Sequence, residues 1–118
     1  MPDPPVTARR SVELVTGGIF VIAGLPKFVA FDWELAAFRQ FGLPAAPAWV
    51  IAAGLIEIVG GFLVLTGRHV RPAAALLAVT MAVAVYSSGI LEGDVIPSLT
   101  LAPALGVASA YLAFAAAP

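Results

Sequence analysis

Two ionisable residues lie in strongly apolar stretches of this 118-residue chain, and both could do chemistry there. Glu57 stands in the middle of a long apolar run, and Lys27 lies near the end of an earlier one. An unpaired charge near the centre of a bilayer costs several kcal/mol, so this carboxyl must be paired, hydrogen-bonded or protonated. Such an acid can bind a polar ligand or exchange a proton. A purely structural hydrogen bond to another helix is the alternative.

The face around Glu57 consists of small residues. If the run is a helix, the residues three and four positions away lie beside the acid, and these are Ala53, Gly54, Gly60 and Gly61. Small residues let a second backbone approach closely. The pattern therefore predicts that Glu57 faces a neighbouring helix and not lipid. Gly24 shares a face with Lys27 in the earlier run and favours the same close packing.

The sequence predicts a gap between the two candidate residues. Counted from the ends of their runs, Lys27 and Glu57 differ in depth by roughly 10 Å. A lysine side chain covers about half of that, so a water or a ligand head group would complete the link. Lys27 fits the mouth of such a pocket and equally fits snorkelling to the lipid headgroups. Tyr86 and Trp49 complete the candidate ligand-binding set, although both also suit an aromatic belt at headgroup depth.

Composition excludes several classes of function. The chain is 61% hydrophobic and 11% charged, with a mean hydropathy of +1.02, whereas soluble domains carry about 25% charged residues. The lipid bilayer is therefore the expected solvent. A net charge of −1 without a basic patch excludes nucleic-acid binding. With no cysteine, one histidine and no metal-ligand spacing, we expect no metal site and no covalently bound cofactor, so any redox role needs a diffusible or partner-held group.

Four apolar runs supply the elements that would position these residues. They cover about 11–30, 47–66, 72–90 and 97–116, and about 20 helical residues cross a hydrocarbon core of about 30 Å. They predict an all-α integral membrane protein, an antiparallel four-helix bundle in a single domain over residues 9–118. Residues 1–8 are predicted to be a disordered tail. Pro26 is expected to bend the first span, and Glu13 is expected to pair with Arg9 or Arg10.

The basic residues predict the orientation of the bundle. One side holds Arg9, Arg10, Arg68 and Arg71, and the other holds Lys27 and Arg39. The positive-inside rule then places both termini in the cytoplasm. In the first outer loop, Phe31, Leu35 and Phe38 recur at helical spacing and predict a short interfacial amphipathic helix. Residues 31–42 could lie in the headgroup region as an anchor or fold over the bundle as a lid.

Several segments, taken in order, resemble the DoxX family. They are Gly17-Gly18-Ile19-Phe20, Ala23-Gly24-Leu25-Pro26-Lys27-Phe28, Phe41-Gly42-Leu43-Pro44, Ile56-Glu57-Ile58-Val59-Gly60-Gly61-Phe62-Leu63 and Thr66-Gly67. The resemblance implies a small four-helix protein of the bacterial inner (cell) membrane. It also implies a place among proteins of which some are membrane subunits in quinone-dependent oxidation. Lys27 and Glu57 are the family-like polar positions.

These observations favour a multi-pass membrane subunit of a quinone-linked oxidoreductase system. It would offer a quinone or small-ligand site near Glu57 and Lys27 and dock a soluble oxidoreductase partner. It would be redox-active only together with that partner. The sequence leaves two alternatives open, a non-catalytic membrane anchor or assembly subunit and a small proton-coupled transporter acting as a dimer. It also leaves open a homo- or hetero-oligomer, and whether Glu57 is catalytic or structural.

Overall fold

The computed structural model describes residues 6–40, 42, 45–90, 93 and 100–115 and shows helices but no strand within them. The helices are α1 (Val6–Gly24), α2 (Pro26–Val29), α3 (Phe31–Gln40), α4 (Ala46–Thr66), α5 (Val70–Ala84) with its π-helical extension η1 (Val85–Ile90), and α6 (Leu101–Ala110) with its extension η2 (Tyr111–Ala115). For these residues the all-α prediction is confirmed.

Three helical stretches are long and apolar enough to cross a membrane: Ala8–Val29, Ala46–Thr66 and Val70–Ser87. They correspond to the first three predicted spans. In the region of the fourth, the described apolar helix Leu101–Phe114 is shorter, and the predicted start at Pro97 lies outside the described residues. The predicted tail also differs in part, because Val6–Ala8 already belong to α1, while residues 1–5 lie outside the described part.

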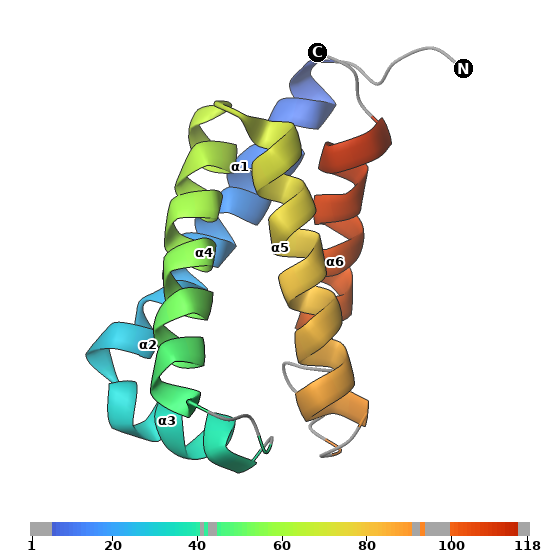
Figure 1. The fold of residues 1–118 in the computed structure, drawn as a ribbon. Helices are drawn as coiled ribbons and strands as arrows, with labels where there is room; N and C mark the ends of the chain where they lie inside the picture. Colours follow the sequence, from blue (N-terminus) through green and yellow to red (C-terminus); the bar gives the residue numbers. More distant parts are fainter. Residues whose placement is uncertain (1–5, 41, 43–44, 91–92, 94–99, 116–118) are drawn as a thin grey trace.

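The long helices pack as two neighbouring pairs (Figure 1). Helix α1 lies along α4, and α6 lies along α5, while the short turn between α4 and α5 joins the pairs. Helix α1 begins and η2 ends at the same end of the molecule as this turn. Helices α2 and α3 lie at the other end, against the first part of α4 (Figure 1). The two ends of the α1–α4 pair therefore carry different sets of polar residues.

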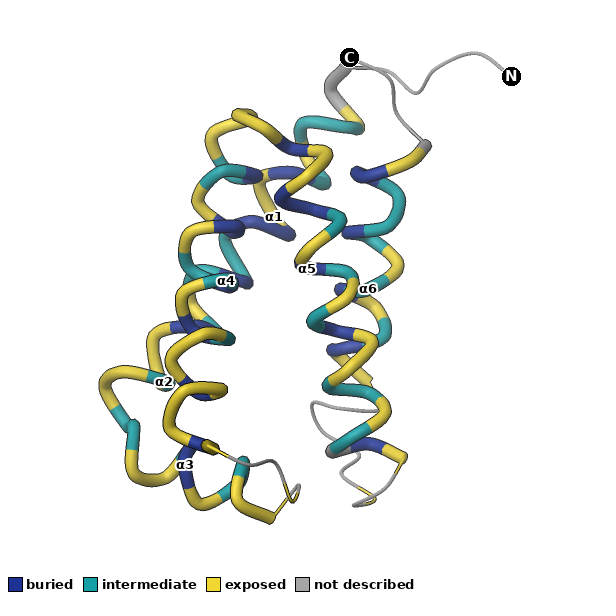
Figure 2. The backbone as a smooth tube through the Cα atoms, in the orientation of Figure 1, coloured by how far each residue is buried: buried dark blue, intermediate teal, exposed yellow. Residues whose placement is uncertain are grey.

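Buried and exposed positions alternate along the helices (Figure 2), and many large apolar residues are among the exposed ones. The main buried cluster joins Phe20 of α1 and Val64 of α4 to Leu77 of α5 and Leu112 of η2. On the outside, Ile22 and Val107 are about 70% exposed (68% and 72%). An apolar exterior of this kind is suited to contact with lipid chains rather than water.

Glycines bring α1 and α4 into backbone contact. A Cβ atom built on Gly17 would lie 2.5 Å from the backbone nitrogen of Leu65 and 2.6 Å from the carbonyl oxygen of Gly61. A Cβ on Gly61 would lie 2.9 Å from the carbonyl oxygen of Gly17. Any larger side chain at these two positions would force the helices apart. The close distance between α1 and α4 therefore depends on the absence of a side chain at Gly17 and Gly61.

The regular α-helix is interrupted next to Pro26, while the predicted bend of the helix axis stays a prediction. Helix α1 ends at Gly24, and α2 begins with Pro26 at its first position, where the missing N–H has no helical partner to lose. The carbonyl of Ile22 accepts a hydrogen bond from the N–H of Leu25, three residues on, at 3.3 Å. Leu25 keeps helical φ and ψ angles, and the chain leaves the helical conformation at Ala30 (φ −118°, ψ 48°); α3 then packs against α4.

The turn after α4 depends on a glycine in the left-handed region. Gly67 has φ +74°, its N–H donates to Val64 O at 3.1 Å, and the N–H of Arg68 donates to Leu63 O at 2.9 Å, which is a Schellman cap. We expect Gly67→Ala to lower the free energy of unfolding by about 1 kcal/mol, measured by reversible SDS unfolding in mixed micelles. Gly18→Ala is the control at a glycine without a positive φ, where an added Cβ would meet nothing within 4 Å. An unchanged stability of Gly67→Ala would contradict this role of the turn.

Candidate functional site

A lysine and two glutamates from three helices meet at one place near the break in the first span. Nζ of Lys27 (α2) lies 3.0 Å from Oε2 of Glu57 (α4) and 3.3 Å from Oε1 of Glu34 (α3). The side chains are 13%, 6% and 19% exposed, respectively. This acid–lysine cluster is therefore largely shut away from the surroundings of the protein, and Glu57 most of all.

The predicted gap between Lys27 and Glu57 is wrong, because the two side chains pair directly. The estimate assumed that the first span and α4 end at the same level. Instead, Lys27 packs beside Gly54, eight residues into α4, so that roughly 12 Å of α4 extends beyond the lysine. From Gly54 to Glu57 is less than one helical turn, a distance that a lysine side chain covers.

Two glycines make this approach possible. A Cβ on Gly54 would lie 3.0 Å from the Cβ of Lys27 and 2.7 Å from the ring of Phe28, and a Cβ on Gly24 would lie 3.2 Å from the Cβ of Glu57. Of the other small neighbours of the acid, Gly60 faces Leu77 of α5, Gly61 faces Phe20 of α1, and Ala53 is half-buried. The small residues therefore border α1, α2 and α5, and Glu57 itself is 5% exposed.

Glu34 is the member of the cluster that sequence reasoning missed. Helix α3 matches the predicted amphipathic helix, and its apolar residues Phe31, Leu35 and Phe38 pack on Ala46 and Val50 at the start of α4. This docking turns Glu34 toward Lys27. The available signal was an acid seven residues after a lysine, on a short helix that must fold back after Pro26. The depth of α3 in the bilayer stays a prediction.

The cluster is not balanced in charge. One ammonium faces two carboxylates, so its net charge is −1 when both acids are ionised and zero when one of them holds a proton. The two contacts are ion pairs at 3.0 and 3.3 Å, and burial removes the water that would otherwise share the excess charge. The arrangement therefore provides both a cationic donor and a place for a proton.

The two aromatic candidates lie apart from this cluster. Trp49 is 50% exposed on the first part of α4, and Tyr86 is 59% exposed in η1. The side chain of Tyr86 lines a surface hollow between α5 and α6 together with Met81, Pro103 and Gly106. Whether either aromatic residue contacts a ligand stays a prediction.

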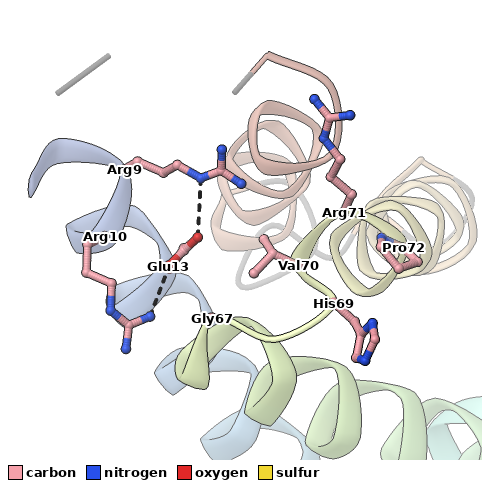
Figure 3. Close-up of a pocket in the computed structure, with 8 residues that line it drawn as sticks. All are labelled: Arg9, Arg10, Glu13, Gly67, His69, Val70, Arg71 and Pro72. Atoms are coloured by element: carbon pink, nitrogen blue, oxygen red, sulfur yellow. Dashed lines mark hydrogen bonds and ion pairs between the residues drawn. The ribbon is translucent and has the colours of Figure 1, made fainter. Parts of the chain in front are cut away.

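A second polar cluster lies at the opposite end of α1. Glu13, which is 7% exposed, pairs with Arg9 at 3.3 Å and with Arg10 at 3.0 Å, as the sequence predicted. Arg10 also donates to the carbonyl of Leu65 at 2.7 Å, which ties the start of α1 to the end of α4. A pocket of about 370 Å³ opens beside these residues (Figure 3) and is lined by Arg9, Arg10, Glu13, Gly67, His69, Val70, Arg71 and Pro72.

Comparisons with known proteins agree with this membrane architecture. The family model of DoxX matches residues 13–89. A Bacillus subtilis (strain 168) protein named "Putative oxidoreductase CatD" is 40% identical over 70 residues, which are 59% of this chain and 51% of that protein. "Uncharacterized membrane protein Rv3486" of Mycobacterium tuberculosis is 38% identical over 72 residues, 59% of this chain and 44% of that protein. The matches thus span about half the length of these relatives. No solved structure matches the chain.

Proposed function

Because the chain belongs to the DoxX family of membrane proteins, we propose that it is a membrane subunit of a quinone-linked oxidoreductase system. The observation that carries the proposal is the buried contact of Lys27 with Glu57 and Glu34. A relative named as an oxidoreductase supports the reaction class. The lipid-facing exterior supports a substrate that is itself dissolved in the bilayer.

The residues of the cluster fit a quinone head group. The carbonyl oxygens of a quinone accept hydrogen bonds, and the ammonium of Lys27 carries three N–H donors. A carboxyl beside the same oxygen can deliver or receive a proton.

A bound quinone would supply the redox chemistry, taking up two electrons and two protons to become the quinol. The electrons would come from a reduced flavin or metal centre held by a soluble oxidoreductase that docks on this subunit. Lys27 would orient the ring by donating to a carbonyl oxygen. Glu57 would hold a proton next to that oxygen, and Glu34, which is the more exposed acid, would pass protons between the cluster and water.

We expect Glu57→Gln to weaken binding of a quinone analogue at least about tenfold, because the acid next to the lysine is lost. The fold should survive, since Lys27 keeps its contact with Glu34. The measurement is saturation binding of the analogue to the protein in lipid nanodiscs, with the melting temperature Tm of each variant recorded beside it. Glu34→Gln should leave the affinity equal or higher, because Lys27 then has one acid fewer to hold.

Asp32→Asn is the matched control, since it removes an exposed carboxylate from the same helix. Its affinity should equal that of the wild type. Absence of saturable binding in the wild type, or equal binding by Glu57→Gln, would contradict the proposed site. A soluble partner that copurifies with Glu57→Ala, in the absence of any quinone binding, would instead support an anchoring role.

A further inference from the structure

We propose that the pocket between the start of α1 and the α4–α5 turn binds a phosphate-bearing anion, with the headgroup of an anionic phospholipid as its source. This pocket lies at the other end of the α1–α4 pair from the acid–lysine cluster. The proposed quinone chemistry does not involve this pocket, so the two proposals can be tested independently.

The pocket is strongly basic for a chain whose net charge is −1. Three arginines and one glutamate line it, which gives the lining a net charge of +2 with His69 neutral. Half of the six basic residues of the chain are therefore gathered around one hollow of about 370 Å³. A hollow of this size accommodates a phosphate group and the glycerol beside it.

The three arginines have different tasks. Arg10 is held by Glu13 and by the carbonyl of Leu65, so it fastens α1 to α4. Arg9 and Arg71 lie on opposite sides of the pocket, on α1 and α5, with Val70 between them (Figure 3). The side chain of Arg9 is 16% exposed and is oriented by its contact with Glu13. Guanidinium groups placed on two sides of a hollow suit the several oxygens of a phosphate.

The depth of the pocket favours a lipid source. The candidate span of α1 begins at Ala8, that of α4 ends at Thr66, and that of α5 begins at Val70. The pocket thus lies where three apolar helices reach the level of the lipid headgroups. Val70 and Pro72 give its lining an apolar part next to the arginines, which suits a headgroup with attached acyl chains. Basic pockets between membrane helices are suited to anionic headgroups.

The test measures lipid binding to the full chain in a non-ionic detergent by native mass spectrometry. Phosphatidylglycerol, phosphatidylcholine and inorganic phosphate are titrated separately. We expect one phosphatidylglycerol to bind at least about tenfold more tightly than phosphatidylcholine. Arg71→Gln should remove most of this preference. Arg71 is exposed at the start of α5, so the variant should fold, and Arg9→Gln provides a second variant on the other side of the pocket.

Arg68→Gln is the matched control, because Arg68 is exposed in the same turn and does not line the pocket. It should keep the preference for phosphatidylglycerol. Binding of inorganic phosphate that is lost in Arg71→Gln, without a preference between the two lipids, would keep the anion site and assign it a soluble ligand. Equal losses in Arg68→Gln and Arg71→Gln would show only diffuse attraction to a basic surface, and would overturn the proposal, as would the absence of binding by either anion.

Discussion

Gly17→Ala is expected to destabilise the protein by at least about 3 kcal/mol, a large part of the 5–15 kcal/mol that stabilises a typical domain. The added methyl group would lie 2.5 Å from the nitrogen of Leu65 and 2.6 Å from the oxygen of Gly61. Both are backbone atoms of α4 that cannot turn away as a side chain can, so the helices must separate. Reversible SDS unfolding in mixed micelles, followed by the fluorescence of Trp33 and Trp49, measures the loss.

Gly18→Ala is the control for Gly17→Ala, because the two glycines are neighbours in one helix and differ in their surroundings. A Cβ on Gly18 meets nothing within 4 Å, and alanine is favoured over glycine inside a helix by about 1 kcal/mol. Gly18→Ala should therefore be neutral or slightly stabilising. Equal effects of the two substitutions would show that α1 and α4 are not in backbone contact.

Lys27→Met is expected to lower the free energy of unfolding by about 3–5 kcal/mol, because it leaves two carboxylates facing each other in a buried place. The carboxylate of Glu57 would stay buried without a positive partner, since its side chain is 6% exposed. The side chain of Glu34 is 19% exposed and can turn outward. The double variant Lys27→Met with Glu57→Leu should recover more than half of the loss, because it removes the stranded charge together with its partner. The same SDS unfolding measures all three proteins.

Arg39→Met controls for the simple loss of a positive charge near this end of the bundle. Arg39 is exposed on α3, and its replacement should change stability by less than about 0.5 kcal/mol. A small effect of Lys27→Met, or a double variant that is as unstable as the single one, would contradict a buried and mutually dependent ion pair. These outcomes concern stability alone and do not depend on any ligand.

The sequence predicts where the helices of this protein lie along the chain better than it predicts how far each helix is shifted along its neighbour. Apolar runs, the helix-breaking Pro26 and the spacing of Phe31, Leu35 and Phe38 each report on a few neighbouring residues, and the structure has helices or a break in those places. How far one helix extends beyond another depends on where α2 and α3 dock. That docking is set by contacts such as Leu35 with Val50, which no local pattern encodes.

The candidate site shows the same limit. Glu57 and Lys27 were found because a charge in an apolar run is rare, and Glu13 because its arginines are one turn away along the same helix. Glu34 looked like an ordinary polar residue of an amphipathic helix, since its partner lies on another helix. The predicted distance between Lys27 and Glu57 is wrong for a related reason. It depends on how far α2 and α4 are shifted along each other, which the sequence does not show.

The contacts of Lys27 and Gly17 with α4 join residues far apart in the sequence, and this has a consequence during synthesis of the chain. Chains are synthesised at about 5–20 residues per second from the N-terminus, so Lys27 is made about 1.5–6 seconds before Glu57, which follows 30 residues later. During those seconds Lys27 has no Glu57, and Gly17 has no opposing Gly61. The first segment is therefore synthesised before the residues of α4 that pair with Lys27 and cover Gly17.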